Sequence, residues 1–171
     1  MKNTETIINF TPIEQLFTQE ELSKLIKMIN PQPKQCYRNN FLFALLVQSK
    51  YPSIEYAEGV YCSFYVHAFN SIVVNGVKHY IDFSGYYLYK RYGIEQAKQA
   101  IMLRQFSINE IKTLNDERGF MACSIDMDGT LHRYRNKLCK KYKDVNEVIE
   151  SRETVRKPRR KSVNVLVGAY A

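Results

Sequence analysis

The sequence predicts a single α+β domain over residues 1–171, in which an antiparallel sheet packs against an N-terminal helical layer. Two patterns predict this fold class: apolar residues recur at helical spacing before residue 50, and alternating residues flank Asn75-Gly76. A hydrophobic content of 45%, with 13 Tyr, nine Phe and no Trp, is enough for an aromatic-rich core. We divide the chain into N-terminal helices (1–30), a central core (31–92), helices and a hairpin (93–135), and a basic section (136–171).

The first thirty residues predict two helical pieces. Thr11-Pro12 is a capping residue followed by a proline suited to a first helical turn. Thr18 and Glu21 have the spacing of a capping box, and an apolar stripe follows them at Leu22, Leu25, Ile26 and Ile29. We expect these helices to cover the core.

A buried helix is predicted from about Cys36 to Lys50. Pro31-Gln32-Pro33 is a poor helical segment and Tyr51-Pro52 ends the run, while apolar side chains recur between them at Tyr37, Phe41 and Leu45. Cys36 then falls in the first turn, where unpaired backbone amides and the helix dipole favour a thiolate and can receive an oxyanion.

Strands are predicted on both sides of a tight turn. Residues 54–66 are rich in Tyr, Val, Ile and Phe, with a break near Glu58-Gly59. Asn75-Gly76 is typical of a two-residue hairpin turn, in which both residues need positive φ. That turn places Val74 opposite Val77.

Counting outward from the turn sets the register of the hairpin. Phe69 then lies opposite Asp82, and because side chains alternate along a strand, His67 and Asp82 share one face as diagonal neighbours. The other face is predicted to join the core through Ala68, Ile72, Val74, Val77 and Ile81.

A cysteine, a histidine and a carboxylate in this order are the raw material of an activated thiol nucleophile. We expect Cys36 to attack, His67 to hold the proton and Asp82 to orient the imidazole. Further candidates for oxyanion binding or substrate positioning are Gln35, Gln32, Glu58 and Asn70. Each of the three main residues also has a purely structural interpretation, as a small buried thiol, a hydrogen-bonded histidine and a turn aspartate.

The segments that carry these residues resemble a known superfamily. Gln35–Asn39, Glu58-Gly59, His67–Asn70 and Tyr80–Asp82 are similar to compact transglutaminase-like and papain-like cysteine proteins of bacteria and phages. The resemblance covers residues 31–90, about a third of the chain. It implies a Cys at a helix start, with His and Asp on adjacent antiparallel strands. It also implies acyl chemistry on an amide or thioester of a protein or peptide substrate.

The part of the chain after residue 92 predicts two more helices and a hairpin. Residues 94–105 are amphipathic in helical register, and Ser107 and Glu110 form a second capping box before a helix that ends near Arg118-Gly119. Strands are predicted at 120–125 and 130–134.

The turn of this second hairpin, Asp126-Met127-Asp128-Gly129-Thr130, copies the nucleophile motif of haloacid-dehalogenase-type phosphatases. Only 41 residues follow it, too few for the sheet and further ligands which that family needs. Asp-Gly is also a common hairpin turn, so we favour the turn.

Residues 133–161 carry the entire excess charge, with twelve Lys or Arg against four acidic residues. A field of this size suggests an acidic partner, such as nucleic acid or an acidic protein, although a solvated face is the plain alternative. The candidate basic patch consists of Arg133, Arg135, Lys140, Lys141, Arg156, Lys157, Arg159, Arg160 and Lys161. Residues 162–167 alternate like a strand, which predicts that the end of the chain docks on the sheet.

Composition narrows the environment. The four cysteines lack CxxC spacing, so no metal and no cofactor is expected. No apolar run reaches membrane-spanning length and the first residues lack a signal-peptide core, so we expect no membrane partner and a cytoplasmic location, bacterial or that of an infected host.

Two function classes remain open. One is a cysteine peptidase, amidase or acyl transferase. The other is a non-catalytic binding or inhibitor protein on the same fold, which uses the basic section.

Overall fold

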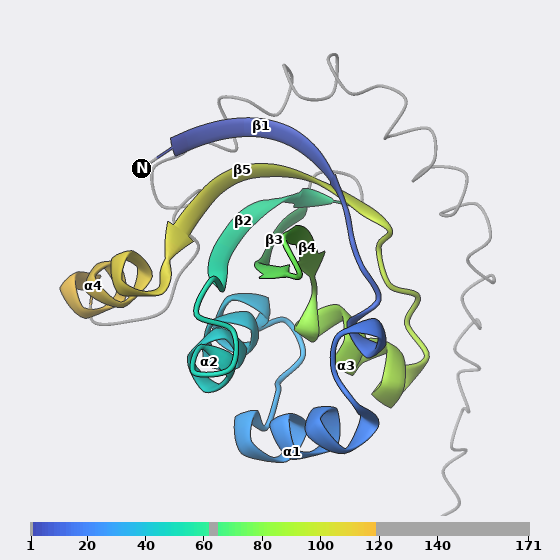
Figure 1. Cartoon of the computed structure of the whole chain (residues 1–171). Helices are drawn as coiled ribbons and strands as arrows, with labels where there is room; N and C mark the ends of the chain where they lie inside the picture. Colours follow the sequence, from blue (N-terminus) through green and yellow to red (C-terminus); the bar gives the residue numbers. More distant parts are fainter. Residues whose placement is uncertain (1, 62–64, 119–171) are drawn as a thin grey trace, which may run out of the picture.

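The computed structural model describes residues 2–61 and 65–118, and within them it shows a curved antiparallel sheet with helices packed beneath it (Figure 1). The sheet order is β1-β5-β2-β3-β4, and each neighbouring pair runs antiparallel. The strands are β1 (Lys2–Asn9), β2 (Glu55–Tyr61), β3 (Tyr65–Val74), β4 (Val77–Ile81) and β5 (Gln99–Ser107). The predicted α+β class is confirmed.

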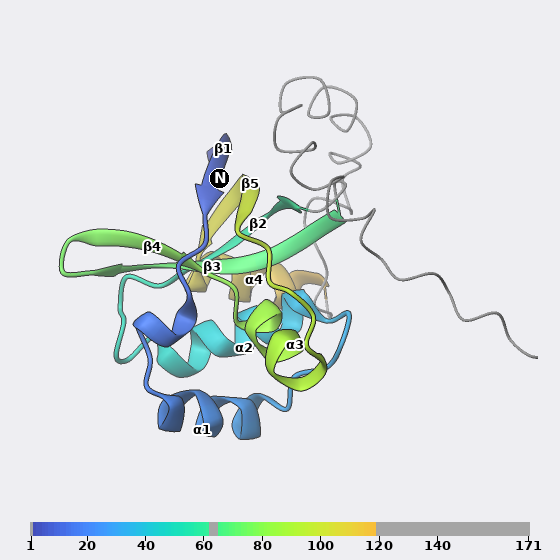
Figure 2. The same cartoon turned by 90° about the vertical axis from the view of Figure 1, so that its right-hand side faces the viewer.

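The helical elements are η1 (Ile13–Gln15), α1 (Gln19–Ile29), α2 (Cys36–Val47), α3 (Phe83–Tyr92) and α4 (Ile108–Arg118). The turned view places α1, α2 and α3 on one side of the sheet, while the β3–β4 hairpin reaches out beyond them (Figure 2). Thus the helix that begins at the candidate nucleophile lies against the strand that carries the candidate histidine.

Both capping boxes are confirmed. The Glu21 backbone N–H donates to Thr18 Oγ1 at 3.2 Å, and the Thr18 N–H donates back to Glu21 Oε2 at 2.8 Å. Ser107 and Glu110 make the same reciprocal pair at 3.2 and 2.7 Å before α4. Asn30, in the left-handed region at φ 46°, ends α1.

The hairpin is confirmed with its register. Asn75 and Gly76 have φ of 51° and 77°, and Val74 pairs with Val77. Of the five residues assigned to the core face, Ala68, Ile72 and Ile81 are fully buried. Val77, 57% exposed, is a wrong assignment, because the hairpin extends past the helical layer that would cover it.

Two segments that the sequence analysis did not assign to strands are strands. Lys2–Asn9 forms β1 ahead of the predicted N-terminal helices, and the predicted helix at 94–105 is replaced by β5, which lies between β1 and β2. A central strand is buried on both faces, so the apolar residues 100–103 are all buried and their spacing also fits a helix. The predicted hairpin at 120–134 with its phosphatase-like turn, the basic section and the strand at 162–167 lie outside the described residues.

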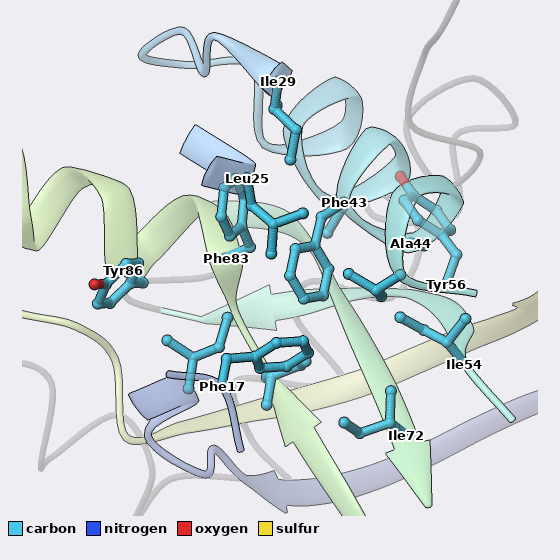
Figure 3. Close-up of a cluster of buried hydrophobic side chains, with 14 of the residues drawn as sticks. Phe17, Leu25, Ile29, Phe43, Ala44, Ile54, Tyr56, Ile72, Phe83 and Tyr86 are labelled. Carbon is cyan, nitrogen blue, oxygen red and sulfur yellow. The ribbon is translucent and has the colours of Figure 1, made fainter. Parts of the chain in front are cut away.

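The main core lies between the helices and the sheet (Figure 3). Phe43 of α2 stacks on Phe83 of α3 with ring centroids 4.9 Å apart, and Phe17 meets Phe43 edge-on at 5.4 Å. Ala44 and Ile72 fill the space between α2 and β3. This packing fixes α2 over the sheet, and with it the position of Cys36.

Candidate active site

Cys36 is the first residue of α2, and its thiol is free and half-buried. The helical ladder begins beside it, where the Asn39 N–H donates to the Gln35 carbonyl at 2.9 Å. The buried Asn39 side chain also closes the preceding loop, since it accepts from the Gln32 N–H at 3.2 Å and donates to the Gln32 carbonyl at 2.8 Å. The loop and the helix start therefore hold the sulfur at a fixed, accessible point.

His67 and Asp82 form a buried hydrogen-bonded pair. Nε2 of His67 lies 2.8 Å from Oδ2 of Asp82, and the two residues are 4% and 8% exposed. Asp82 directly follows β4 and is also the N-cap of α3, where its Oδ1 accepts from the Gly85 N–H at 2.9 Å. The predicted diagonal contact between these two residues is confirmed, because the hairpin register is the predicted one.

The imidazole of His67 is poised to be charged. Burial alone lowers its pKa, but the charge and hydrogen bond of Asp82, followed by the hydrogen bond and charge of Cys36, raise the pKa from 6.5 to about 10. Both partners therefore favour the protonated, charged form of His67 over the neutral form.

The two ring nitrogens of His67 are exchanged relative to the Ser-His-Asp template. In that template Nδ1 faces the carboxylate, whereas here Nε2 does. Because Asp82 occupies Nε2, the ring nitrogen left for the Cys36 sulfur is Nδ1. The division of roles expected from the sequence does not depend on which ring nitrogen faces the carboxylate.

The sequence analysis did not identify two residues that contact the candidate site. Asn40 is fully buried, and its side chain contacts Cys36, Ala68, Asp82 and Phe83. A polar residue four positions after the cysteine, directly before the apolar run of residues 41–47, was the available signal. Gly85 is the second, since a Cβ built there would lie 2.4 Å from Oδ2 and 3.0 Å from Cγ of Asp82.

Replacing Gly85 by Ala is therefore expected to push the Asp82 carboxylate away from His67. The carboxylate is the end of a side chain and can move aside. We therefore expect the free energy of unfolding to fall by an amount near the lower end of the usual overpacking cost, which is about 1–3 kcal/mol. The pKa of His67 should fall by more than one unit, as followed by NMR titration of its ring. Gly93→Ala, at the left-handed end of the same helix (φ 68°), is the matched control and should leave the pKa of His67 unchanged. An unaltered pKa of His67 in the Gly85 variant would contradict this expectation.

The structure separates the four residues expected to bind an oxyanion or position substrate. Gln35 is the exposed N-cap of α2, and the exposed Gln32 donates from Nε2 to the Asn30 carbonyl at 3.2 Å. Glu58 and Asn70 are fully buried within the sheet. Their roles stay predictions, and the two glutamines are the ones on the accessible side.

The buried strand residues have local partners. Glu58 accepts from the Tyr56 hydroxyl at 3.4 Å and lies opposite Arg104 of β5, which is also buried. Asn70 donates to the Glu55 carbonyl at 3.4 Å. These residues lie where β2 pairs with β5 and β3, and Glu58 directly precedes Gly59, the residue that pairs with His67.

Two further observations concern only residues 2–61 and 65–118. In this part of the chain no group of three or more His, Cys, Asp or Glu side chains is placed to hold a metal ion. No helix there is both long and apolar enough to cross a bilayer. The nine residues of the candidate basic patch lie outside the described residues.

Comparisons of the chain with protein-family models, with curated proteins and with solved structures found no match.

Proposed function

We propose that this protein is a cysteine-nucleophile enzyme that cleaves or transfers the acyl group of an amide or thioester, with Cys36, His67 and Asp82 as its catalytic residues. The observation that carries the proposal is the buried His67–Asp82 pair, with Nε2 at 2.8 Å from Oδ2, together with the position of Cys36 at the start of α2, from which it also raises the pKa of His67. A buried histidine with a purely structural role is satisfied by hydrogen bonds to its neighbours and does not require a nearby thiol at a helix start. An imidazolium beside a half-exposed sulfur is the arrangement that generates a thiolate at neutral pH.

The acylation half-reaction follows from this arrangement. Sγ of Cys36 bonds to the substrate carbonyl carbon, and the carbonyl electron pair moves onto oxygen. The backbone N–H groups in the first turn of α2 are the donors that we propose for that oxyanion, helped by the positive end of the helix dipole. As the oxyanion collapses, the bond to nitrogen or sulfur breaks and the His67 proton passes to the leaving group.

The acyl group then remains on Cys36 as a thioester. Water or an amine gives a proton to the neutral His67 and attacks the thioester carbonyl, which releases the acid or the new amide and restores the thiolate. Asp82 holds the ring through both halves, because its hydrogen bond fixes the imidazole plane and favours the charged form. Peptidase, amidase and acyl transferase activities share these steps and differ only in the acceptor.

The basic section at 136–171 suggests how a target is recruited. The whole formal net charge of +8 lies in residues 133–161. This charge favours binding to nucleic acid or to an acidic protein. The same feature supports the second candidate, a non-catalytic binding protein that uses this section while Cys36 is incidental. The two candidates predict different chemistry at the sulfur.

Alkylation of Cys36 separates them. If Cys36 is the nucleophile, iodoacetamide should modify it at nearly the same rate at pH 6 and pH 8, because the proposed mechanism requires a thiolate beside the His67 imidazolium over this whole interval. An ordinary thiol with a pKa of about 8.5 should lose reactivity about 80-fold over that interval. Mass spectrometry of the alkylated peptides reads all four cysteines together, so Cys62, Cys123 and Cys139 serve as internal controls. Modification of Cys36 no faster than those three would overturn the enzyme proposal.

A further inference from the structure

Asn40 is a polar residue at a fully buried position, and hydrophobic packing alone does not explain an amide there. It lies in the second turn of α2, is fully buried, and faces β3, where its side chain donates to the Ala68 carbonyl. Asparagine is a weak helix former, and a buried amide is costly unless its hydrogen bonds are satisfied. All of its bonds go to the elements that carry the three catalytic residues.

Its Nδ2 group shares two N–H bonds among three acceptors. These are the Cys36 carbonyl at 3.1 Å, the Ala68 carbonyl next to His67 at 2.7 Å, and Oδ1 of Asp82 at 3.3 Å. Its Oδ1 accepts from the Phe83 N–H, the residue after Asp82, at 3.1 Å. One side chain therefore joins α2, β3 and the start of α3.

The contact with Asp82 sets which carboxylate oxygen faces His67. Oδ1 of Asp82 receives N–H groups from both Gly85 and Asn40, whereas Oδ2 receives the imidazole. Two donors on Oδ1 hold the carboxylate against rotation about its Cβ–Cγ bond. A rotated carboxylate would lose its alignment with Nε2.

We infer that Asn40 is a positioning residue, which locks the Asp82 carboxylate toward His67 and keeps the nucleophile helix in register with both. It acts through Asp82 and not on substrate. The inference extends the proposed function, but the His67–Asp82 geometry on which it acts can be measured whether or not Cys36 is a nucleophile.

The test uses Asn40→Ala, Asn40→Asp and, as a control for general destabilisation, Leu25→Ala in the core of α1. Circular dichroism first establishes which variants fold. Proton NMR then follows the downfield signal of the His67 Nε2–H, which its bond to Asp82 produces. Alkylation of Cys36 is measured in parallel from pH 5 to 8.

In Asn40→Ala we expect the downfield signal to be lost and alkylation at pH 7 to fall at least about tenfold, because a sulfur without an aligned imidazolium beside it approaches an ordinary thiol, which is only about 3% ionised at pH 7. Leu25→Ala should keep both. Asn40→Asp keeps the size of the side chain but removes the donor at neutral pH, and protonation of the new carboxyl restores one donor toward Asp82. Its downfield signal should therefore reappear as the pH is lowered, which a merely structural role would not produce.

The outcomes separate the two proposals. A retained Nε2–H signal in Asn40→Ala overturns the positioning role, and so does an Asn40→Asp variant whose signal does not change with pH. If Asn40→Ala does not fold, the pH response of Asn40→Asp alone decides. Loss of the signal together with an unreactive wild-type Cys36 would support the positioning role while overturning the proposed enzyme.

Discussion

Replacing Asp82 by Asn is expected to lower the pKa of His67 from about 10 to below 6.5. Burial is the largest single influence on this imidazole and it lowers the pKa, so without the carboxylate charge the desolvated ring should become neutral. The amide oxygen of Asn can still accept from the Gly85 N–H, so the cap of α3 is kept. NMR titration of the His67 ring measures the change directly.

The same substitution should reduce the reactivity of Cys36. Without an imidazolium beside it the sulfur should behave as an ordinary thiol, which is about 3% ionised at pH 7, so alkylation should slow by about 30-fold. Asp116→Asn, the same chemical change at an exposed position of α4, is the matched control and should alter neither quantity. A His67 pKa that stays near 10 in Asp82→Asn would show that the carboxylate is not its main support.

This substitution also has a defined pH signature in stability. A group whose folded pKa lies above its unfolded value stabilises the fold fully below the unfolded pKa, and this stabilisation is lost as the pH rises through the folded pKa. The wild-type protein should therefore exceed Asp82→Asn in free energy of unfolding most strongly below pH 6.5. The difference should shrink as the pH approaches about 10.

Of the glycine substitutions considered, replacing Gly59 by Ala is expected to lower the free energy of unfolding most. A Cβ at this position would lie 2.3 Å from the Ile101 carbonyl oxygen and 3.1 Å from the Met102 Cα, both in the backbone of β5. A paired central strand cannot yield as a side chain can, so β2 and β5 would have to separate where their register shifts, between Glu58 and Gly59. We expect a loss of about 3 kcal/mol, at the upper end of overpacking costs, measured by urea unfolding.

Gly76→Ala is the comparison for this variant. Among the described residues, no non-neighbouring heavy atom lies within 4 Å of a Cβ at Gly76, and only its φ of 77° opposes the change. That strain should cost about 1 kcal/mol. Equal stability of the two variants would mean that the close approach of β5 is not what requires glycine at position 59. Because Gly59 pairs with His67 on β3, a folded Gly59→Ala protein should also show a changed His67 ring signal.

The features that the sequence predicted correctly are those encoded within a few residues. The Thr18 and Ser107 capping boxes and the Asn75-Gly76 turn each need only local backbone geometry. The turn then fixes the pairing of β3 with β4, and that pairing places His67 beside Asp82. This is why the most specific part of the candidate site could be predicted without coordinates.

The errors concern contacts between distant segments. The apolar run in β5 fits a helix as well as a central strand, and its pairing with β1 and β2 decides the matter. Asn40 and Gly85 matter only because three elements meet at Asp82, which spacing along the chain does not reveal. Gly59 was recognised as a break in a strand, yet its cause is the backbone of a strand more than forty residues later.

The ionisation state of the Cys36 sulfur tests the central proposal most directly. The ultraviolet absorption of the thiolate, taken as the difference between the wild type and Cys36→Ala across a pH series, reports this sulfur alone. We predict that the difference is already fully developed at pH 6. A difference that develops only as the pH passes about 8.5, where an unperturbed thiol ionises, would contradict the thiolate–imidazolium pair.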